Sequence, residues 1–287
     1  MSQGRALRLL ALSVLLFGGV WPVTKDAMRF ATPMWFGCWR AVLAGIATIL
    51  FLAALGKLRL PRRGDWPALL VIGGLQIGAF FAFMHAALAH VPSGRAALIG
   101  NVTLFWLVPL AVLLLGERVS RTRWAAAGLG FAGVFVMVGP WAFDWSAPGM
   151  LLGHALMLAA SLSWSVAILV LRRWPPRSSI LGLLPWAFAL AGVMLAVIAA
   201  IMEPGGGVGP GAWLQAVLIG VVAAPLGTWA TTEAGRSLNA VLASIGFLLV
   251  PIFGIALGTL WLGEPFGWDF MVGGGLIAAG VLLAAKG

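Results

Sequence analysis

Two carboxylates, Glu117 and Glu264, end the near-identical apolar stretches LAVLLLGE and LGTLWLGE and stand 147 positions apart. Two cations, Lys25 and Arg172, end two other apolar stretches at the same separation of 147 positions. A carboxylate placed just before a helix can accept hydrogen bonds from the unpaired N–H groups of the first turn. We therefore expect Glu117 and Glu264 to cap the helices that follow them rather than to carry protons.

Several polar and aromatic side chains lie in the middle of long apolar stretches, where they could contact a small ligand. Gln76 precedes Phe80 by one helical turn, so the two side chains would share a face. Trp164 stands among serines in SLSWS, and its ring could hold an ammonium group by a cation–π contact worth roughly 0.5–2 kcal/mol. Packing between helices is the competing explanation for each of these residues. The candidate ligand contacts are Trp21, Gln76, Phe80, Asn101, Trp164, Ser244 and Phe247.

Arg40 is the charged residue whose placement costs most, because it falls inside the second apolar stretch. A cation at the centre of a membrane helix costs about 2.5–3.5 kcal/mol. Three roles are open for Arg40: its guanidinium can reach out to the nearer helix end, pair with Asp26, or bind a carboxylate. Proline interrupts helical hydrogen bonding, and a bend at Pro22 would suit a gate.

The composition decides the class of protein in which these residues act. Of 287 residues, 62% are hydrophobic and 9% are charged, and the mean hydropathy is +1.05. A soluble domain of this length carries far more charge, so we expect an integral membrane protein. The net charge of +10 does not indicate nucleic-acid binding, because the Lys and Arg residues lie in short gaps between apolar runs. With the single cysteine Cys38, the chain can form no internal disulfide and no thiolate metal cluster, and we expect no metal and no cofactor.

Ten apolar stretches are long enough to cross the hydrocarbon core as helices, which takes about 20 residues each. With the N-terminus inside, the inner gaps hold fourteen of the Lys and Arg residues and the outer gaps hold three. The positive-inside rule therefore predicts that both termini are cytoplasmic. The stretches are 7–24, 33–55, 67–89, 94–115, 122–140, 148–171, 179–202, 211–232, 237–261 and 267–285.

The first half of the sequence recurs in the second half. A shift of 147 positions aligns WRAVLAG (39–45) with WAFALAG (186–192), and AGLGFAGV (127–134) with GGLIAAGV (274–281). We interpret this as a duplication of a five-helix unit, with repeats at 1–140 and 148–287. Because five is odd, the second repeat is inverted in the membrane. Inverted repeats are typical of secondary transporters, which bind substrate between the repeats and alternate access to it. Gating or structural roles are assigned to Pro22, Lys25, Arg40, Glu117, Arg172, Pro251 and Glu264.

Taken together, the motifs resemble the drug/metabolite transporter superfamily, specifically its ten-helix members with two EamA-type repeats. The resemblance covers nearly the whole chain, and Leu104 departs from it, because the family usually has proline at the position matching Pro251. The stretches that carry it are FGGVWPVTKDA (17–27), PMWFGCWRAVLAG (33–45), ALAHVPSGRAALI (87–99), LGERVSRTRWAAAGLGFAGVFVMVG (115–139) and LLVPIFGIALGTLWLGEPF (248–266).

The resemblance implies a bacterial inner-membrane carrier that exports small metabolites, with amino acids, especially aromatic or apolar ones, as the favoured substrates. Drugs, nucleotide-sugars and purines are alternatives on the same fold. A channel would need rings of charge, and an enzyme would need a motif such as HExxH, which the sequence lacks. Every acidic residue falls at the end of a span or in a gap, so we expect facilitated rather than proton-coupled transport. The expected partners are a small-molecule substrate and the lipid bilayer, without nucleic acid, and the chain can act as a monomer.

Overall fold

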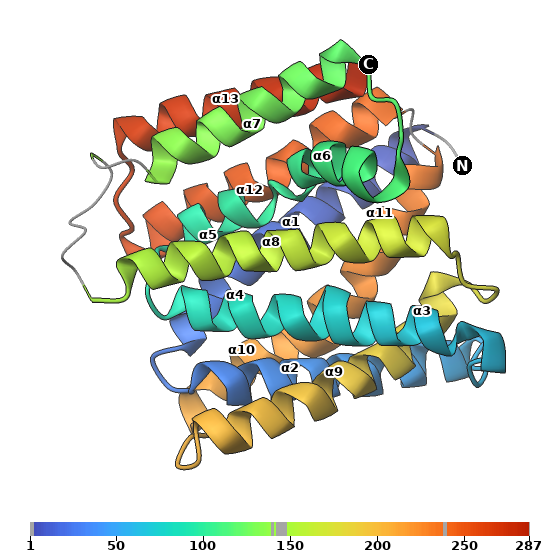
Figure 1. The fold of residues 1–287 in the computed structure, drawn as a ribbon. Coiled ribbons are helices and arrows are strands. Elements are labelled where there is room, and N and C mark those ends of the chain that lie inside the picture. The colour runs from blue at the N-terminus through green and yellow to red at the C-terminus, as the bar shows by residue number, and fades with distance from the viewer. Residues whose placement is uncertain (1–2, 139–140, 142–147, 238–239, 287) are drawn as a thin grey trace.

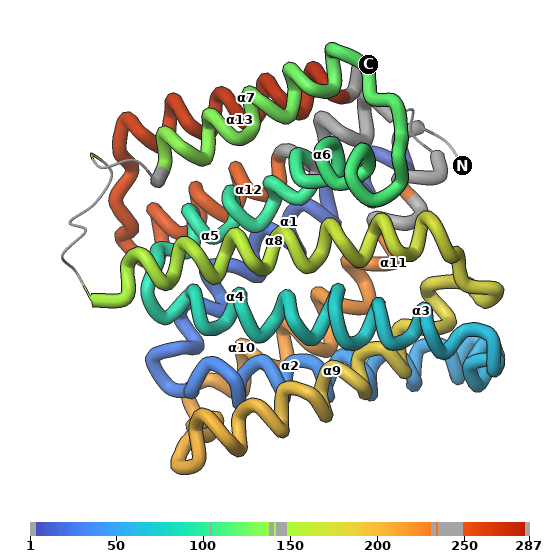
Figure 2. Tube along the Cα trace, viewed as in Figure 1, coloured from blue at the N-terminus to red at the C-terminus, as the bar shows by residue number. Residues whose placement is uncertain are grey.

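The computed structural model of the chain describes residues 3–138, 141, 148–237 and 240–286 (Figures 1 and 2). Side chains are described in these ranges except at 3, 104, 138, 231–233, 235–237, 240–248 and 285–286. Every longer element in this part of the chain is a helix, and one isolated β-bridge joins Ala31 and Val208. The elements are α1 (Gln3–Ala27), α2 (Pro33–Ala54), η1 (Arg63–Asp65), α3 (Trp66–Leu70), η2 (Val71–Ala79), α4 (Phe80–Leu88), α5 (Ser93–Gly100), α6 (Thr103–Leu115), α7 (Arg121–Val138), α8 (Met150–Arg173), α9 (Ile180–Met202), η3 (Pro210–Ala212), α10 (Trp213–Val217), η4 (Leu218–Ala223), α11 (Ala224–Ser237), α12 (Ala240–Leu262) and α13 (Trp268–Lys286).

Seven helical stretches among the described residues are long and apolar enough to cross a membrane. Large apolar side chains such as Leu113, Ile201 and Leu260 are exposed on the surface of the bundle, as lipid-facing residues are. The prediction of an all-helical, multi-span membrane protein is confirmed, while the count of ten spans stays a prediction. The seven stretches are Gly4–Ala27, Pro33–Ala54, Arg63–Leu88, Ser93–Leu115, Met150–Arg173, Ile180–Met202 and Pro210–Ala230, with shorter apolar helices at Leu249–Leu262 and Trp268–Ala284.

The helices lie side by side in one bundle, with their long axes roughly aligned (Figure 1). The pair α7 and α13 forms one edge, α2, α9 and α10 form the opposite edge, and α1, α5, α8 and α12 lie between them. α1 begins and α13 ends at the same end of the bundle, which we call the Arg172 end because Arg172 lies in the last turn of α8 there. We call the opposite end the Lys25 end, because Lys25 lies in the last turn of α1.

Glycines allow α7 and α13 to approach each other closely as an antiparallel pair. A Cβ atom on Gly133 would lie 2.5 Å from the carbonyl oxygen of Gly273, and one on Gly280 would lie 2.8 Å from the carbonyl oxygen of Ala126. Gly133 corresponds to Gly280 after a shift of 147 residues, and Ala126 corresponds to Gly273. One contact is therefore converted into the other when each residue is replaced by its counterpart in the other half.

The segments η2 and η4 are π-helical, and they begin 147 residues apart. Each carries a glycine in close contact with a neighbouring helix. A Cβ atom on Gly73 would lie 2.8 Å from the Ala187 carbonyl oxygen, and one on Gly220 would lie 2.9 Å from the Arg40 carbonyl oxygen. These contacts too are exchanged by the shift of 147 residues, because Gly73 corresponds to Gly220 and Arg40 to Ala187.

The expected fourth span, 94–115, is not one continuous helix. α5 ends at Gly100 and α6 begins at Thr103, and the two segments are offset from each other (Figure 2). The Asn101 side chain donates a hydrogen bond to the Ala97 carbonyl (2.7 Å), and the Thr103 hydroxyl donates to the Gly100 carbonyl (3.0 Å). Side chains that bond to nearby carbonyls offer the backbone an alternative to the helix. Asn101 thus lies at a break, which corrects its predicted position within a single helix.

Candidate functional site

Three of the predicted ligand contacts come together near the middle of the bundle. The Phe80 ring lies edge-on to the ring of Trp164, with 5.0 Å between centroids, and to the ring of Trp21, at 6.5 Å. Trp21 is buried, and a Cβ atom on Gly100 would lie 2.6 Å from its ring. Phe80 and Trp164 are half-buried. We call Trp21, Phe80 and Trp164 the aromatic cluster; its rings come from α1, α4 and α8 and offer apolar and π surfaces.

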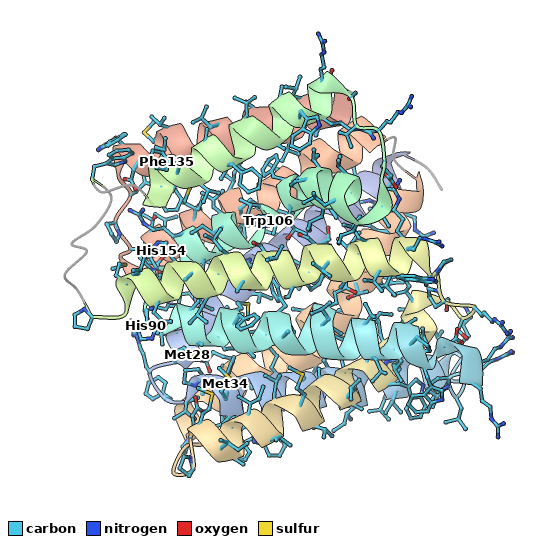
Figure 3. The ribbon with its side chains drawn as sticks, in the orientation of Figure 1. Met28, Met34, His90, Trp106, Phe135 and His154 are labelled. Atoms are coloured by element: carbon cyan, nitrogen blue, oxygen red, sulfur yellow. The ribbon has the colours of Figure 1, made fainter. Side chains whose placement is uncertain are left out.

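Trp106 on α6 is an aromatic neighbour of α8 that the sequence analysis did not single out (Figure 3). Its indole N–H donates to the Ser161 hydroxyl (3.0 Å), and its ring lies 4.9 Å from the ring of Phe131. The Ser165 hydroxyl donates to the Thr103 carbonyl (3.0 Å). The serines beside Trp164 therefore join α6 to α8.

The other candidate ligand contacts have different surroundings. Gln76 is half-buried within η2, where i→i+5 hydrogen bonding widens each turn, so Phe80 does not follow it on a regular α-helical face. Asn101 is bonded to the end of its own helix, as described above. Ser244 and Phe247 belong to α12, but their side chains lie outside the described residues. Within the described part of the chain, neither Gln76 nor Asn101 forms a side-chain hydrogen bond to the aromatic cluster.

A cavity of about 360 Å³ opens at the Lys25 end of the bundle. Ligand pockets of small molecules usually have volumes of about 300–1,000 Å³. Within this cavity Asp26 forms an ion pair with Arg29 (3.4 Å) and accepts a hydrogen bond from the Gln215 side chain (3.0 Å). The lining combines both signs of charge with apolar groups: Lys25, Asp26, Met28, Arg29, Pro33, Leu88, Ala89, Leu262 and Glu264.

Lys25 is fixed on the wall of this cavity by the end of α4. Its Nζ atom donates to the carbonyl oxygens of Leu88 (2.5 Å) and Val91 (3.0 Å). Carbonyls at the end of a helix have no partner within that helix, and a cation there is electrostatically favourable. Lys25 thus ties α1 to the connection between α4 and α5.

Glu264 holds the other side of the same connection. Its carboxylate accepts hydrogen bonds from the Ser93 N–H (2.6 Å), the Ser93 hydroxyl (2.9 Å) and the Gly94 N–H (2.9 Å), in the first turn of α5. The prediction that Glu264 caps the helix following it is therefore wrong. Asp269 already lies in the first turn of that helix, α13, and Glu264 reaches across to the other half of the chain instead.

Glu117 and Arg172 form an ion pair of 3.2 Å at the opposite end of the bundle. The shift of 147 residues relates Arg172 to Lys25 and Glu117 to Glu264. The two matched charge pairs thus lie at opposite ends, but with different contacts. Arg172 and Glu117 bond directly, whereas the described side chains of Lys25 and Glu264 form no ion pair with each other.

Arg40 occupies a position that contradicts two of its predicted roles. It does not reach out to the helix end, because only 8% of its surface is exposed. It does not pair with Asp26, which is engaged by Arg29 and Gln215. The Arg40 guanidinium carbon instead lies 4.2 Å from the centroid of the Phe81 ring. The third role, carboxylate binding, stays a prediction.

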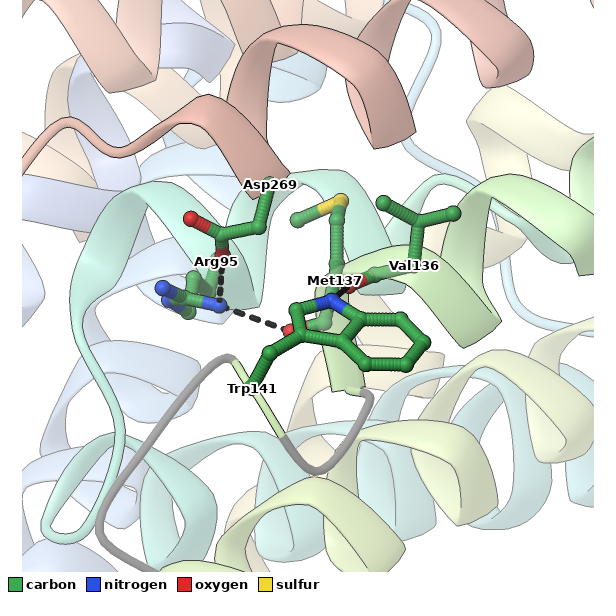
Figure 4. A network of polar contacts seen from close by, with 5 residues as sticks. All are labelled: Arg95, Val136, Met137, Trp141 and Asp269. Carbon is green, nitrogen blue, oxygen red and sulfur yellow. Dashed lines mark hydrogen bonds and ion pairs between the residues drawn. The ribbon is translucent and has the colours of Figure 1, made fainter.

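Arg95, at the start of the expected fourth span, is buried in α5 and forms an ion pair of 2.7 Å with Asp269 of α13 (Figure 4). Its guanidinium also donates to the Met137 carbonyl at the end of α7 (2.7 Å). The Trp141 indole N–H donates to the Val136 carbonyl (2.8 Å) close by. This network fastens α5 to the α7–α13 edge.

The remaining assignments concern prolines, histidines and metals. Pro22 lies within α1 and Pro251 within α12, as expected. His154 is buried, and its Nδ1 atom lies 2.8 Å from the Met150 carbonyl oxygen. Within the described residues, no group of three or more His, Cys, Asp or Glu side chains is arranged to hold a metal ion.

Comparison with family models finds one match that covers most of the chain. The model described as "EamA-like transporter family" matches residues 5–139 and again residues 151–286. The chain is also similar over nearly its whole length to a solved crystal structure described only as "Crystal structure of protein". The TM-score is 0.68 at 22% sequence identity, and the match covers 99% of this chain and 97% of that one. This likeness shows the fold alone.

Three curated relatives align with almost the entire chain. The "Uncharacterized transporter YvbV" of Bacillus subtilis is 26% identical over 97% of this chain and 91% of its own length. The "Probable terminal-alkyne amino-acid exporter" of Streptantibioticus cattleyicolor is 25% identical over 99% and 94%, respectively. The "Probable amino-acid metabolite efflux pump" of Salmonella typhimurium is 26% identical over 96% and 93%.

Proposed function

The chain belongs to the EamA-like transporter family, and from this premise we propose that it is a secondary carrier that exports small metabolites, with amino acids as the favoured class. The favoured substrates have aromatic or other apolar side chains. Transport is by alternating access through a path between two inverted five-helix repeats, residues 1–140 and 148–287, which together form ten spans. Drugs, nucleotide-sugars and purines are the alternative substrate classes.

The contacts between the two halves support the inverted arrangement. Gly133 contacts Gly273 where Ala126 contacts Gly280, and Gly73 approaches α9 where Gly220 approaches α2. Each contact is the counterpart of the other under the shift of 147 residues. Paired contacts of this kind are expected when the two halves of the chain are related by a two-fold axis. A carrier of two inverted repeats alternates between two conformations of similar energy, in which the halves exchange their roles.

The observation that carries the proposal is the matched placement of the two charge pairs at opposite ends. At the Arg172 end, Arg172 and Glu117 bond directly (3.2 Å). At the Lys25 end, Lys25 and Glu264 bond to the α4–α5 connection instead and line the cavity there. In this proposal, the structure represents the state that is open at the Lys25 end and closed at the Arg172 end. The reverse state would pair Lys25 with Glu264 and separate Arg172 from Glu117.

The aromatic cluster supports the substrate class. Three rings from α1, α4 and α8 meet in the interior, and such surfaces bind apolar side chains and organic cations. Two of the relatives are named for amino-acid or amino-acid-metabolite export, which favours the same class. A nucleotide-sugar would require several inward-facing cations for its phosphates.

The positions of the acidic side chains support facilitated transport. A proton-coupled carrier generally places a carboxylate at depth within a span. The described acidic side chains lie instead at helix ends or in connections: Asp26, Asp65, Glu117, Glu203, Glu264 and Asp269. The carrier would therefore move substrate down its own gradient.

Counterflow into proteoliposomes tests the proposal. Purified protein is reconstituted with unlabelled L-phenylalanine inside, and uptake of labelled L-phenylalanine is followed with and without an imposed pH gradient. Saturable uptake that needs internal substrate, at equal rates in both conditions, is expected. A strict requirement for the pH gradient would refute the facilitated mechanism. Exchange of nucleosides or cationic drugs without exchange of any amino acid would refute the substrate class, and flux without saturation would indicate a channel.

We further propose that the protein lies in the bacterial inner membrane, with both termini in the cytoplasm, and can act as a monomer. Cys38 is buried, so a single introduced cysteine gives a clean accessibility signal. In whole cells, Arg29→Cys should react with a membrane-impermeant thiol reagent, and Lys57→Cys should react only after the membrane is opened. Equal reactivity of the two variants in intact cells would contradict this topology.

A further inference from the structure

Arg40 and His85 are two buried side chains with unused hydrogen-bonding atoms, and both lie against the ring of Phe81. The Arg40 guanidinium carbon is 4.2 Å from the Phe81 ring centroid, and the His85 ring centroid is 5.6 Å from it. Arg40 is 8% exposed and His85 is 0% exposed. Among the described residues, the Nε and Nη1 atoms of Arg40 have no acceptor, and the Nε2 atom of His85 has no hydrogen-bond partner.

The free atoms of the two residues are of opposite kinds. Arginine remains protonated, so its free nitrogens are donors that seek an anion. His85 Nδ1 lies 2.6 Å from the Phe81 carbonyl oxygen, which can only accept, so the proton of the ring is on Nδ1. A second positive charge beside Arg40 in this apolar interior would be unfavourable, so the ring is neutral and Nε2 presents a lone pair. The pair therefore offers donors to an anion at Arg40 and an acceptor at His85.

An α-amino acid carries the two matching groups on adjacent atoms. Its carboxylate accepts from a guanidinium, and its ammonium group donates to an imidazole nitrogen. Phe80 of the aromatic cluster directly precedes Phe81, and the two ring centroids are 6.4 Å apart. At the beginning of α4, Arg40 and His85 thus lie beside the Phe81 ring, and the other rings of the aromatic cluster lie beside the Phe80 ring.

We propose that Arg40 and His85 recognise the carboxylate and ammonium groups of an α-amino acid substrate, whose side chain meets the aromatic cluster. The inference rests on the proposed function and deepens it, because it assigns the residues that select amino acids from amines and acids of the same shape. A purely structural cation–π contact of Arg40 would influence stability, but it would not distinguish among such ligands.

The test compares three competitors of labelled L-phenylalanine counterflow: unlabelled L-phenylalanine, phenethylamine, which lacks the carboxylate, and 3-phenylpropionate, which lacks the ammonium group. With the wild-type protein, each incomplete competitor should be weaker than L-phenylalanine by about tenfold or more, the value of a charge-assisted hydrogen bond. Arg40→Met should abolish the preference over phenethylamine and keep the preference over 3-phenylpropionate. His85→Phe should show the opposite pattern.

Arg123→Gln is the matched control, because Arg123 is an exposed cation in the first turn of α7 that lines neither the cavity nor the aromatic cluster. This variant should keep both preferences. If Arg40→Met retains the full preference for L-phenylalanine over phenethylamine, the inference is overturned while the proposed function stands. If wild-type protein exchanges no amino acid at all, the proposed function falls and the inference with it. Should Arg40→Met fail to fold, the wild-type competition decides, and equal inhibition by phenethylamine and L-phenylalanine overturns the inference.

Discussion

Arg172 and Glu117 form an ion pair of 3.2 Å at one end of the bundle, in the positions that match Lys25 and Glu264 at the other end. The Arg172 side chain is 61% exposed and that of Glu117 is 33% exposed. Exposed pairs contribute about 0–1 kcal/mol to stability, so this pair cannot serve mainly to hold the fold. A gate, in contrast, needs a contact that opens easily, and an exposed ion pair has that property.

Reversing one charge of this pair should therefore slow transport more than it lowers stability. We expect Arg172→Glu to reduce the counterflow rate, because two carboxylates would face each other in the closed gate. The double variant Arg172→Glu/Glu117→Arg should recover most of the rate. Arg173→Glu, at the next position, is the control and should transport normally. A double variant no faster than Arg172→Glu alone would contradict a direct role of the pair.

Glu264 should matter for stability as well as for gating. Its carboxylate accepts from the backbone N–H groups of Ser93 and Gly94, as a helix cap does. Loss of a capping side chain costs about 0.5–2 kcal/mol. We expect Glu264→Ala to lower the thermal unfolding midpoint of the protein in lipid nanodiscs, followed by tryptophan fluorescence. Asp26→Asn keeps the α4–α5 connection intact and should leave the midpoint nearly unchanged. An unchanged midpoint for Glu264→Ala would show that water replaces the carboxylate without loss.

The two adjacent glycines of η2 should respond differently to the same substitution. A Cβ atom on Gly73 would lie 2.8 Å from the Ala187 carbonyl oxygen, whereas one on Gly74 would have nothing within 4 Å. Overpacking at a fixed backbone contact costs about 1–3 kcal/mol. Gly73→Ala should thus lower the unfolding midpoint and the yield of monodisperse protein, and Gly74→Ala should behave as wild type. Equal behaviour of the two variants would mean that the contact between η2 and α9 is looser than the structure indicates.

The helical character was predictable because long apolar stretches are visible in the sequence itself, whereas the duplication of a five-helix unit stays a prediction. The shift of 147 residues relates Lys25 to Arg172 and Glu117 to Glu264 without any three-dimensional information. Trp21, Phe80 and Trp164 could be selected because each is a large ring within an apolar stretch, and the structure brings them together.

The partners of charged residues were not predictable in the same way, because they come from distant parts of the chain. Glu264 lies five residues before Asp269, yet it bonds to Ser93, and Asp269 bonds to Arg95. Local capping rules assign a carboxylate to the nearest helix, and the packing of the two halves overrides them here. The surroundings of Arg40 depend on how α2 lies against α4, which no periodicity of α2 alone reveals.

The aromatic cluster should set the apparent affinity for aromatic substrates. Trp164 and Phe80 contact each other edge to face, with 5.0 Å between centroids. A contact between the Trp164 ring and an aromatic substrate ring would contribute about 0.5–1.5 kcal/mol beyond the area it buries. Losing the Trp164 ring should therefore raise KM by about two- to tenfold. We expect Trp164→Ala to raise the KM of L-phenylalanine counterflow and to raise that of L-alanine less. Trp174→Ala removes an exposed tryptophan at the C-cap of the same helix, α8, and is the control. Equal effects of Trp164→Ala on both substrates would refute side-chain recognition at this ring.

Among the described electrostatic contacts, the buried ion pair of Arg95 and Asp269 should be the one whose loss lowers the stability of the protein most. Both side chains are nearly inaccessible, 6% and 7% exposed, and the pair joins α5 to α13. Breaking a buried ion pair by removing one partner costs about 3–5 kcal/mol, because the other charge is left without compensation. Asp269→Asn should therefore strongly lower the yield of folded protein and its unfolding midpoint in nanodiscs.

Replacing both partners with apolar side chains separates the cost of an unpaired charge from the value of the pair itself. Substitution of a buried ion pair by packed hydrophobic residues is often neutral or stabilising. The double variant Arg95→Met/Asp269→Leu should thus be clearly more stable than Asp269→Asn, although it also loses the hydrogen bond from Arg95 to Met137. Asp26→Asn, at the more exposed pair with Arg29, should change the midpoint little. If the double variant is as unstable as Asp269→Asn, then Arg95 and Asp269 support the α7–α13 edge through specific bonds rather than through charge balance.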